Sequence, residues 1–267
     1  DPDPIFKGLG MVTDAVWSAV DNSPRKDLLV CGEWMPITLL SHDGSRWSKR
    51  TIPNTEGLWQ SISSVDLDGD GDEDLVAGNI GHNHDLRATA AHPARMYVAD
   101  FDQNTTPEAV ISYYVQNQDY SFFSKDELAG EMVILKKKYT DYHSFAQSRL
   151  DQVFVDLEKN PINKSVSQLA STIFENNGKG QYTAHPLPFS AQSTMIFSIL
   201  PTDVNGDNLT DLMLGGNIYE VTPSFGRMDG GYGTVLINKG KMQFEELPTD
   251  QSGFFVPGAI RDIQTFT

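Results

Sequence analysis

Cysteine, long apolar runs and basic residues are all scarce in this sequence of 267 residues. Its one cysteine, Cys31, excludes an intrachain disulfide and a zinc site built on several cysteines. No apolar run approaches the roughly 20 residues that a membrane-spanning helix needs. The 20 lysine and arginine residues against 36 acidic residues give a formal charge of −16, which argues against nucleic-acid binding and against docking on an anionic membrane.

The surplus of acidic residues is compatible with cationic partners, either metal ions or basic proteins, and equally with an acidic surface that keeps the protein soluble. The position of the acidic residues along the chain narrows this choice. An acidic loop followed by an apolar, β-prone run occurs at residues 66–79, again at 203–217, and in a looser form at 100–113. The sequence therefore contains an internal repeat.

A fourth copy of the repeat survives in outline before residue 27. It retains Asp27 and the apolar run after it, whereas Ala19 and Ser23 stand where the other copies have acidic or amide ligands. A period of about 35–50 residues, with short strands and Gly- or Asn-rich turns, is typical of propeller blades of four strands each. The sequence therefore predicts an all-β fold, a β-propeller with about four blades in this chain, as a single partial domain over residues 1–267.

The long interval between the second and third acidic loops has a different periodicity. Ser124 and Glu127 form a capping-box pattern, and Leu128 and Leu135 follow it at helical spacing. The sequence therefore predicts a helical insertion at about 122–172, within one blade.

The spacing of oxygen-bearing residues in the acidic loops indicates metal binding. Ligands at loop positions 1, 3, 5 and 9, with the carbonyl at position 7, converge when the backbone coils around one point, and such an all-oxygen set suits Ca²⁺ better than Mg²⁺. The candidate metal ligands are Asp66, Asp68, Asp70, Asp72, Asp74, Asp100, Asp102, Asn104, Thr106, Glu108, Asp203, Asn205, Asp207, Leu209 and Asp211. An EF-hand would need an acidic ligand at position 12, where these loops have Ala77, Ile111 and Leu214. We expect two to three Ca²⁺ sites, the loop 100–108 being the least regular because Thr105 replaces a turn-forming residue.

These loops and several other segments carry a resemblance to a known family. The chain resembles FG-GAP/VCBS-repeat β-propellers, whose Ca²⁺ loops are similar to those of the integrin α-subunit, and in particular a group of large secreted proteins of Bacteroidetes-type bacteria. The segments that carry this resemblance are Gly10–Trp17, Gly32–Ile37, Gly78–Gly81, Ile111–Tyr114 and Ser252–Pro257. The resemblance implies a propeller of about seven blades. We therefore expect this chain to belong to a larger polypeptide that is exported to the periplasm, the outer-membrane surface or the extracellular space.

The sequence leaves more than one function open. The first hypothesis is a non-enzymatic module in which Ca²⁺ is structural and the loops bind a protein or glycan ligand, with no nucleic-acid partner and no membrane insertion. A polysaccharide lyase or glycoside hydrolase on the same fold is the alternative, because fold does not fix function, and an architectural segment of an adhesin is a third. No catalytic residues are assigned. For a ligand site we single out Trp59, His84, Tyr120 and Tyr219, and we expect Cys31 to be a buried core thiol.

Overall fold

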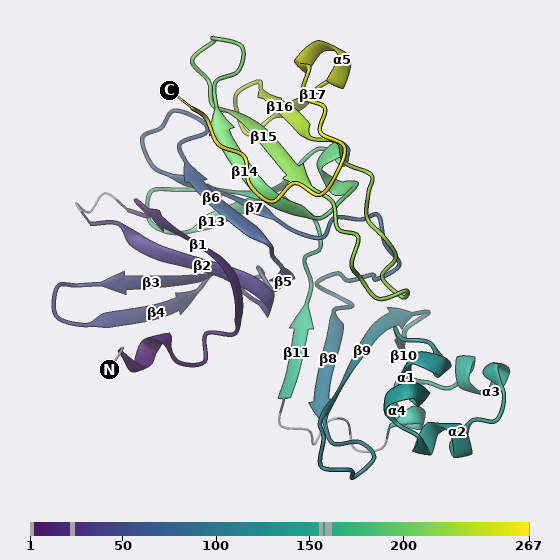
Figure 1. The fold of residues 1–267 in the computed structure, drawn as a ribbon. Coiled ribbons are helices and arrows are strands. Elements are labelled where there is room, and N and C mark those ends of the chain that lie inside the picture. Colours follow the sequence, from purple (N-terminus) through teal and green to yellow (C-terminus); the bar gives the residue numbers. More distant parts are fainter. Residues whose placement is uncertain (1–2, 22–24, 155–156, 158–161, 267) are drawn as a thin grey trace. The chain divides into compact units, whose positions relative to one another are not determined.

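The computed structural model describes residues 3–21, 25–154, 157 and 162–266. Contacts within the chain divide it into two compact units, both built on antiparallel β-sheets (Figure 1). The first unit comprises Asp1–His84, Leu169–Val221 and Gly226–Thr267, and the second comprises Asp85–Gln168 and Thr222–Phe225. In the described part of the chain, every helix is too short or too polar to cross a membrane.

Three antiparallel sheets make up the first unit. The first sheet contains β1 (Met11–Ser18), β2 (Asp27–Met35), β3 (Thr38–His42) and β4 (Trp47–Thr51), with β5 (Gly57–Leu58) beside β2. The second sheet contains β6 (Ser61–Val65), β7 (Asp74–Gly78), β12 (Thr172–Asn176) and β13 (Tyr182–Pro186). The third sheet contains β14 (Ile196–Thr202), β15 (Asp211–Gly216), β16 (Thr234–Asn238) and β17 (Phe244–Leu247). The short helices of this unit are η1 (Pro4–Phe6), η3 (Phe189–Gln192) and α5 (Thr249–Ser252).

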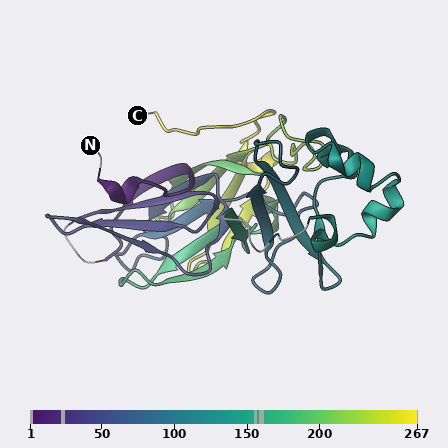
Figure 2. The same ribbon diagram turned by 90° about the horizontal axis from the view of Figure 1, so that it is seen from below.

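The inner strands of the second sheet, β7 and β12, are buried on both faces. The first strand of this sheet, β6, contacts β1 of the first sheet and β14 of the third, so the three sheets follow one another in chain order (Figure 2). Successive side chains of β7 enter opposite cores: Leu75 and Ala77 pack with Trp59 and Phe174, while Val76 packs in the core shared with the third sheet. This burial explains why β7 is a continuous apolar run and not an alternating one.

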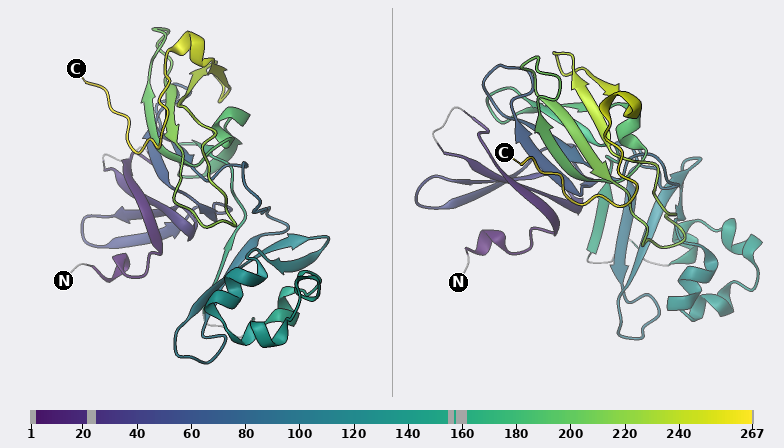
Figure 3. Two further views of the ribbon diagram at one scale, coloured as in Figure 1. Left: turned by 45° about the vertical axis from the view of Figure 1, so that its right-hand side comes forward. Right: turned by 45° about the horizontal axis from the view of Figure 1, so that its top comes forward.

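The second unit contains the fourth sheet and most of the helices (Figure 3). Its strands, in the order β10-β9-β8-β11, are β8 (Ala94–Ala99), β9 (Glu108–Val115), β10 (Gln118–Ser121) and β11 (Ile162–Val166). The helices are α1 (Lys125–Glu131), α2 (Ile134–Lys138), α3 (Tyr142–Ala146) and α4 (Leu150–Val153). Their side chains Leu128, Met132 and Leu150 pack with Tyr97 and Val110 of the sheet and form a core of their own. The predicted capping box is present at the start of α1.

The four antiparallel sheets confirm the predicted all-β, propeller-like fold. The expected series of consecutive blades differs from the structure at one sheet, which is inserted between two strands of another sheet. The loop 100–108 connects β8 and β9 of the second unit, which lies in sequence between β7 and β12. β7 nevertheless pairs directly with β12, with Leu75 opposite Phe174, and such non-local pairing leaves no trace in repeat spacing. The helices occupy 125–153 of the segment expected to be helical at 122–172, and β11 lies in the same segment.

Candidate metal-binding loops

Each of the three acidic loops connects two neighbouring antiparallel strands: β6 and β7, β8 and β9, or β14 and β15. In every loop the carboxylate at position 1 accepts hydrogen bonds from two backbone N–H groups further along the loop, at N···O distances of 2.7–3.1 Å. The donors are Gly69 and Gly71 for Asp66, Asn104 and Thr105 for Asp100, and Gly206 and Asn208 for Asp203. Asp203 also accepts a hydrogen bond from the backbone N–H of Asn205 at 3.2 Å. The three loops therefore coil around the position-1 side chain in the same way.

Position 6 of each loop has a left-handed backbone. Its φ is 96° at Gly71, 76° at Thr105 and 67° at Asn208. Glycine and asparagine adopt this conformation readily, whereas a β-branched residue is strained in it. Thr105, which the sequence marks as the irregular position, is therefore a strained residue in an otherwise equivalent turn.

The first loop, residues 66–74, gathers three carboxylates. Asp66, Asp68 and Asp74 each place one oxygen atom within 4.8 Å of the other two. Asp74 is buried, and so is Asp72, whose Oδ1 has no hydrogen-bond partner among the described residues. Asp70 is exposed and accepts a hydrogen bond from the backbone N–H of Asp72 at 3.1 Å. A buried carboxylate oxygen without a donor is the kind of group that a cation satisfies.

Burial and mutual repulsion oppose ionisation in this loop. Burial raises the pKa of Asp74 to about 7, even though two backbone N–H groups donate to it, and the charges of Asp68 and Asp72 act in the same direction. Burial, together with the charges of the other loop acids, also raises the pKa of Asp68 and Asp72. A bound dication would remove this repulsion, because opposite charge favours the ionised form.

The loop 100–108 of the second unit gathers a similar group. Oxygen atoms of Asp100, Asp102 and Glu108 lie within 4.8 Å of one another. Glu108 is buried, and Oδ1 of Asp102 has no hydrogen-bond partner within the described part of the chain. The Asn104 side-chain amide lies 3.5 Å from Oε1 of Glu108, and the backbone N–H of Thr106 donates to Asn104 Oδ1 at 2.7 Å.

The loop 203–211 does not gather three acidic side chains in this way among the residues that the structure describes. Asn205 at position 3 donates its side-chain amide to Oδ2 of Asp207 at 3.0 Å, and the backbone N–H of Leu209 donates to Oδ1 of Asp207 at 2.9 Å. Backbone N–H donors from within the loop lower the pKa of Asp203. Asp211 is buried. The polar groups of this loop therefore largely satisfy one another.

The acids at position 9 of the two loops in the first unit have partners that loop spacing does not reveal. Asp74 and Asp211 each accept a backbone hydrogen bond from loop position 2 at 3.0 Å. Each also accepts a backbone hydrogen bond, at 2.8 Å, from an asparagine that ends the third strand of its sheet. These asparagines are Asn176 of β12 and Asn238 of β16.

The side chains of the two asparagines connect neighbouring sheets. Nδ2 of Asn176 donates to the carbonyl of Val20 at 3.0 Å, and Nδ2 of Asn238 donates to the carbonyl of Leu67 at 2.8 Å. Leu67 is position 2 of the first acidic loop, and Val20 is position 2 of the outline copy, which has Ala19 and Ser23 at positions 1 and 5. The outline copy therefore occupies the same place in its sheet as the intact copies. Its residue Ser23 lies outside the described residues.

Two of the four residues singled out for a ligand site are not at the surface of the protein. Trp59 is fully buried and His84 is buried, so their expected role in contacting a ligand is wrong. Tyr219 is 38% exposed in the first unit, and Tyr120 belongs to the second unit. Cys31 is buried as expected, and burial raises the pKa of its thiol to about 12.

Comparison with known proteins adds one assignment. Residues 58–84 match the family model of the FG-GAP repeat. No curated protein matches the chain significantly. The matched segment includes β6, the acidic loop 66–74 and β7, so it coincides with the loop of the first unit in which three carboxylates converge. Residues 58–84 are therefore similar to an FG-GAP repeat.

Proposed function

We propose that the protein is a calcium-stabilised, non-enzymatic β-propeller module of an exported protein, and that it binds a protein or a glycan. The FG-GAP repeat is a non-catalytic kind of module, and its match covers the acidic loop. The observation that carries the calcium assignment is the convergence of Asp66, Asp68 and Asp74 on one point. Export rests on the resemblance of the chain to secreted repeat proteins.

The donor set of the loop 66–74 fits Ca²⁺. Calcium binds carboxylate and carbonyl oxygens at about 2.3–2.6 Å, so two ligands of one ion lie at most about 5 Å apart. The oxygen atoms of Asp66, Asp68 and Asp74 meet this limit, and the unpartnered oxygen of Asp72 lies in the same loop. Asp70 and the carbonyl of Asp72 are the further ligands expected from the spacing.

The role of the ion would be structural. Asp74 connects the loop to β12 through the backbone of Asn176, so a cation held by the loop is linked to the core of the second sheet. Because the unfolded chain has no such site, the free energy of binding adds to the free energy of folding.

The calcium assignment is tested by thermal unfolding of the purified protein in excess Ca²⁺, in excess Mg²⁺ and in chelator. We expect Ca²⁺ to raise the melting temperature well above both other conditions, and Asp68→Ala to reduce this increase. Asp250→Ala, which removes an exposed acid outside the loops, is the matched control and is expected to keep the full increase. A melting temperature that chelator leaves unchanged would contradict calcium stabilisation.

The non-enzymatic assignment has its own test. The protein is incubated with soluble plant and host polysaccharides in excess Ca²⁺, and new reducing ends and unsaturated products are measured. We expect neither. Products that increase with protein concentration would favour the alternative hypothesis of a lyase or hydrolase.

A further inference from the structure

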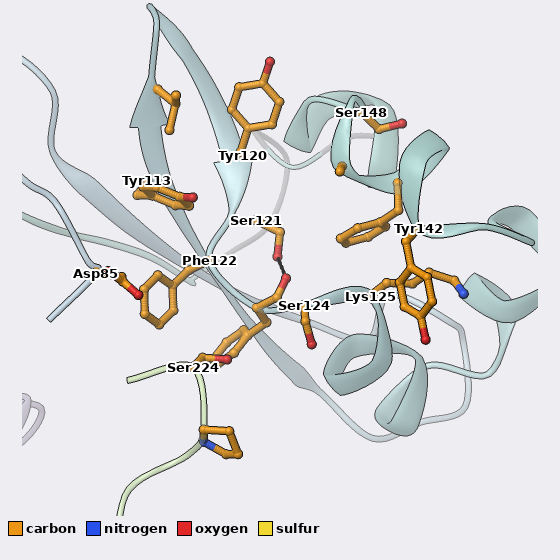
Figure 4. A pocket seen from close by; sticks show the side chains of 15 residues that line it. Asp85, Tyr113, Tyr120, Ser121, Phe122, Ser124, Lys125, Tyr142, Ser148 and Ser224 are labelled. Carbon is orange, nitrogen blue, oxygen red and sulfur yellow. Dashed lines mark hydrogen bonds between the residues drawn. The ribbon is translucent and has the colours of Figure 1, made fainter. Parts of the chain in front are cut away.

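The second unit contains an open cleft of about 780 Å³ that the acidic loops do not line (Figure 4). Its walls come from the β9–β10 hairpin, from α1 and α3, and from residues 223–224. Its volume is within the roughly 300–1,000 Å³ that is common for sites of small ligands. All of these residues belong to one compact unit, so the cleft is a property of that unit alone.

Aromatic rings stand on opposite walls of the cleft. Tyr113 and Tyr120 are directly opposed residues of β9 and β10 and therefore share one face of the hairpin, while Tyr142 and Phe145 come from α3 (Figure 4). Tyr142 is 65% exposed. Tyr113, Tyr120 and Phe145 are half-buried. The accessible parts of these rings leave flat apolar surfaces that a ligand can cover.

Two of these rings are held in place before any ligand binds. The hydroxyl of Tyr142 donates to Asp126 Oδ2 at 2.8 Å, and Nζ of Lys125 lies 4.5 Å from the centroid of its ring. On the other wall, the ring of Phe122 meets Tyr113 edge to face at a centroid distance of 5.9 Å. Pre-ordered rings lose little conformational entropy when a ligand stacks on them.

Three serine hydroxyls that line the cleft already donate their hydrogen atoms to protein acceptors. Ser121 donates to the carbonyl of Phe123 at 2.9 Å, Ser148 donates to the carbonyl of Ser144 at 2.8 Å, and Ser224 donates to the carboxylate of Glu127. A hydroxyl has one hydrogen but two lone pairs, so each of these oxygens can still accept. The cleft therefore favours a ligand that brings many donors of its own.

Among the described residues that line the cleft, Asp85 and Lys125 carry opposite charges, so the lining has no excess of either sign. A phosphate or carboxylate ligand brings acceptors and negative charge, and it would meet the serine acceptors with one lysine as its counter-ion. A purely apolar ligand would bury the serine oxygens without donors, which is costly. A neutral ligand with apolar faces and many hydroxyl groups satisfies both the rings and the serines.

We propose that this cleft binds a neutral oligosaccharide, whose sugar rings stack on Tyr120 and Tyr142 and whose hydroxyl groups donate to Ser121 and Ser148. This assignment rests on the proposed ligand-binding function and names its ligand class and its site. The tyrosines supply the apolar contact, the serines accept, and Lys125 donates.

The proposal is tested by calorimetric titration of the whole protein, in excess Ca²⁺, with neutral oligosaccharides of glucose, mannose, xylose and N-acetylglucosamine. We expect saturable binding of at least one of them, weakened about fivefold or more by Tyr120→Ala and by Tyr142→Ala because each removes a stacking surface. Tyr142→Phe keeps the ring and is expected to retain most of the affinity. Tyr232→Ala removes an exposed ring of the first unit and is the matched control, expected to leave binding unchanged.

Two results would overturn the cleft assignment: no binding of any of these oligosaccharides to the folded protein, or binding that both tyrosine-to-alanine variants leave unchanged. Circular dichroism establishes that each variant is folded. Calcium-dependent melting is measured on the same samples, so the two proposals fail separately. A melting temperature that depends on Ca²⁺, without sugar binding, would refute only the proposal that the cleft binds an oligosaccharide. Sugar binding with a melting temperature that does not depend on Ca²⁺ would refute only the calcium assignment.

Discussion

The acidic loops 66–74 and 203–211 have the same backbone frame but hold different sets of side chains. In both, the position-9 aspartate accepts the same two backbone hydrogen bonds, at 3.0 and 2.8 Å. Three carboxylates converge in the first loop, whereas Asn205 stands at position 3 of the other and donates to Asp207. The anchoring of a loop and the gathering of its ligands are therefore separate properties, the first set by backbone contacts and the second by the number of charges.

The largest expected effect concerns the backbone hydrogen bonds that the position-9 aspartate accepts in both loops. In chelator, Asp74→Ala and Asp211→Ala are each expected to lower the free energy of unfolding by about 3 kcal/mol, because each leaves two backbone N–H groups without an acceptor at about 1–3 kcal/mol per group. Urea unfolding measures both. Asp74→Asn and Asp211→Asn keep one acceptor oxygen and should lose less. A loss of stability in only one of the two variants to alanine would show that the backbone contacts of the two loops do not contribute equally.

The second prediction concerns the side chains expected to bind Ca²⁺ in the two loops. Calcium at about 100 times its dissociation constant stabilises a protein by about 2.7 kcal/mol per site. Asp68→Asn is expected to remove most of this gain for the first loop, and Asp207→Asn is expected to remove less, because fewer charges give the other loop a weaker site. Unfolding in urea with and without Ca²⁺ measures the gain.

A converse variant sharpens the same comparison. Asn205→Asp gives the loop 203–211 the acid that Asp68 supplies to the first loop, and it removes the amide that donates to Asp207. We expect the calcium-dependent gain in stability to increase and the stability in chelator to fall, because like charges then repel. An unchanged calcium response would mean that charge count does not set the affinity of this loop.

The third prediction separates the two asparagines that connect neighbouring sheets. The side chain of Asn238 donates to two carbonyls and accepts from the backbone N–H of Gly240, whereas Oδ1 of Asn176 is buried and has no partner among the described residues. We expect Asn238→Ala to cost about 2 kcal/mol and Asn176→Ala about 1 kcal/mol, because the second variant also removes an unsatisfied oxygen. Equal losses would contradict this assignment of the contacts.

The sequence predicts the sheets well because their signals are local. The apolar run of β7, the turn residues at position 6 and the capping box at Ser124 each depend on neighbouring residues. The pairing of β7 with β12 is not local, because the second unit lies between them in sequence. A loop that recurs in an inserted sheet therefore has the same appearance in the sequence as a loop in a further blade.

The candidate site is predictable only in part for the same reason. Loop spacing identifies the acids, but convergence depends on how neighbouring side chains pair, as Asn205 and Asp207 do. The asparagines at 176 and 238 lie outside the loops, and the available signal is an asparagine that ends an apolar strand with a glycine two residues later, at Gly178 and Gly240. Burial of Trp59 and His84 follows from long-range packing, which periodicity does not report.

The smallest expected effect concerns the first sheet, whose outline loop has Ala19 and Ser23 in place of two ligand residues. Cys31 lies in β2, is fully buried, and has a pKa raised by burial to about 12, so a thiol reagent reaches it only when this sheet opens. We expect chelator to leave the rate of Cys31 labelling unchanged while hydrogen exchange accelerates in the loop 66–74. Labelling that accelerates in chelator would show that the metal loop also supports the first sheet. The contacts available for such support are the hydrogen bond from Asn176 to Val20 and the hydrogen bonds that Glu73 of the loop accepts from Ala19 and Lys26. Asn176→Ala or Glu73→Ala should then accelerate labelling even in Ca²⁺.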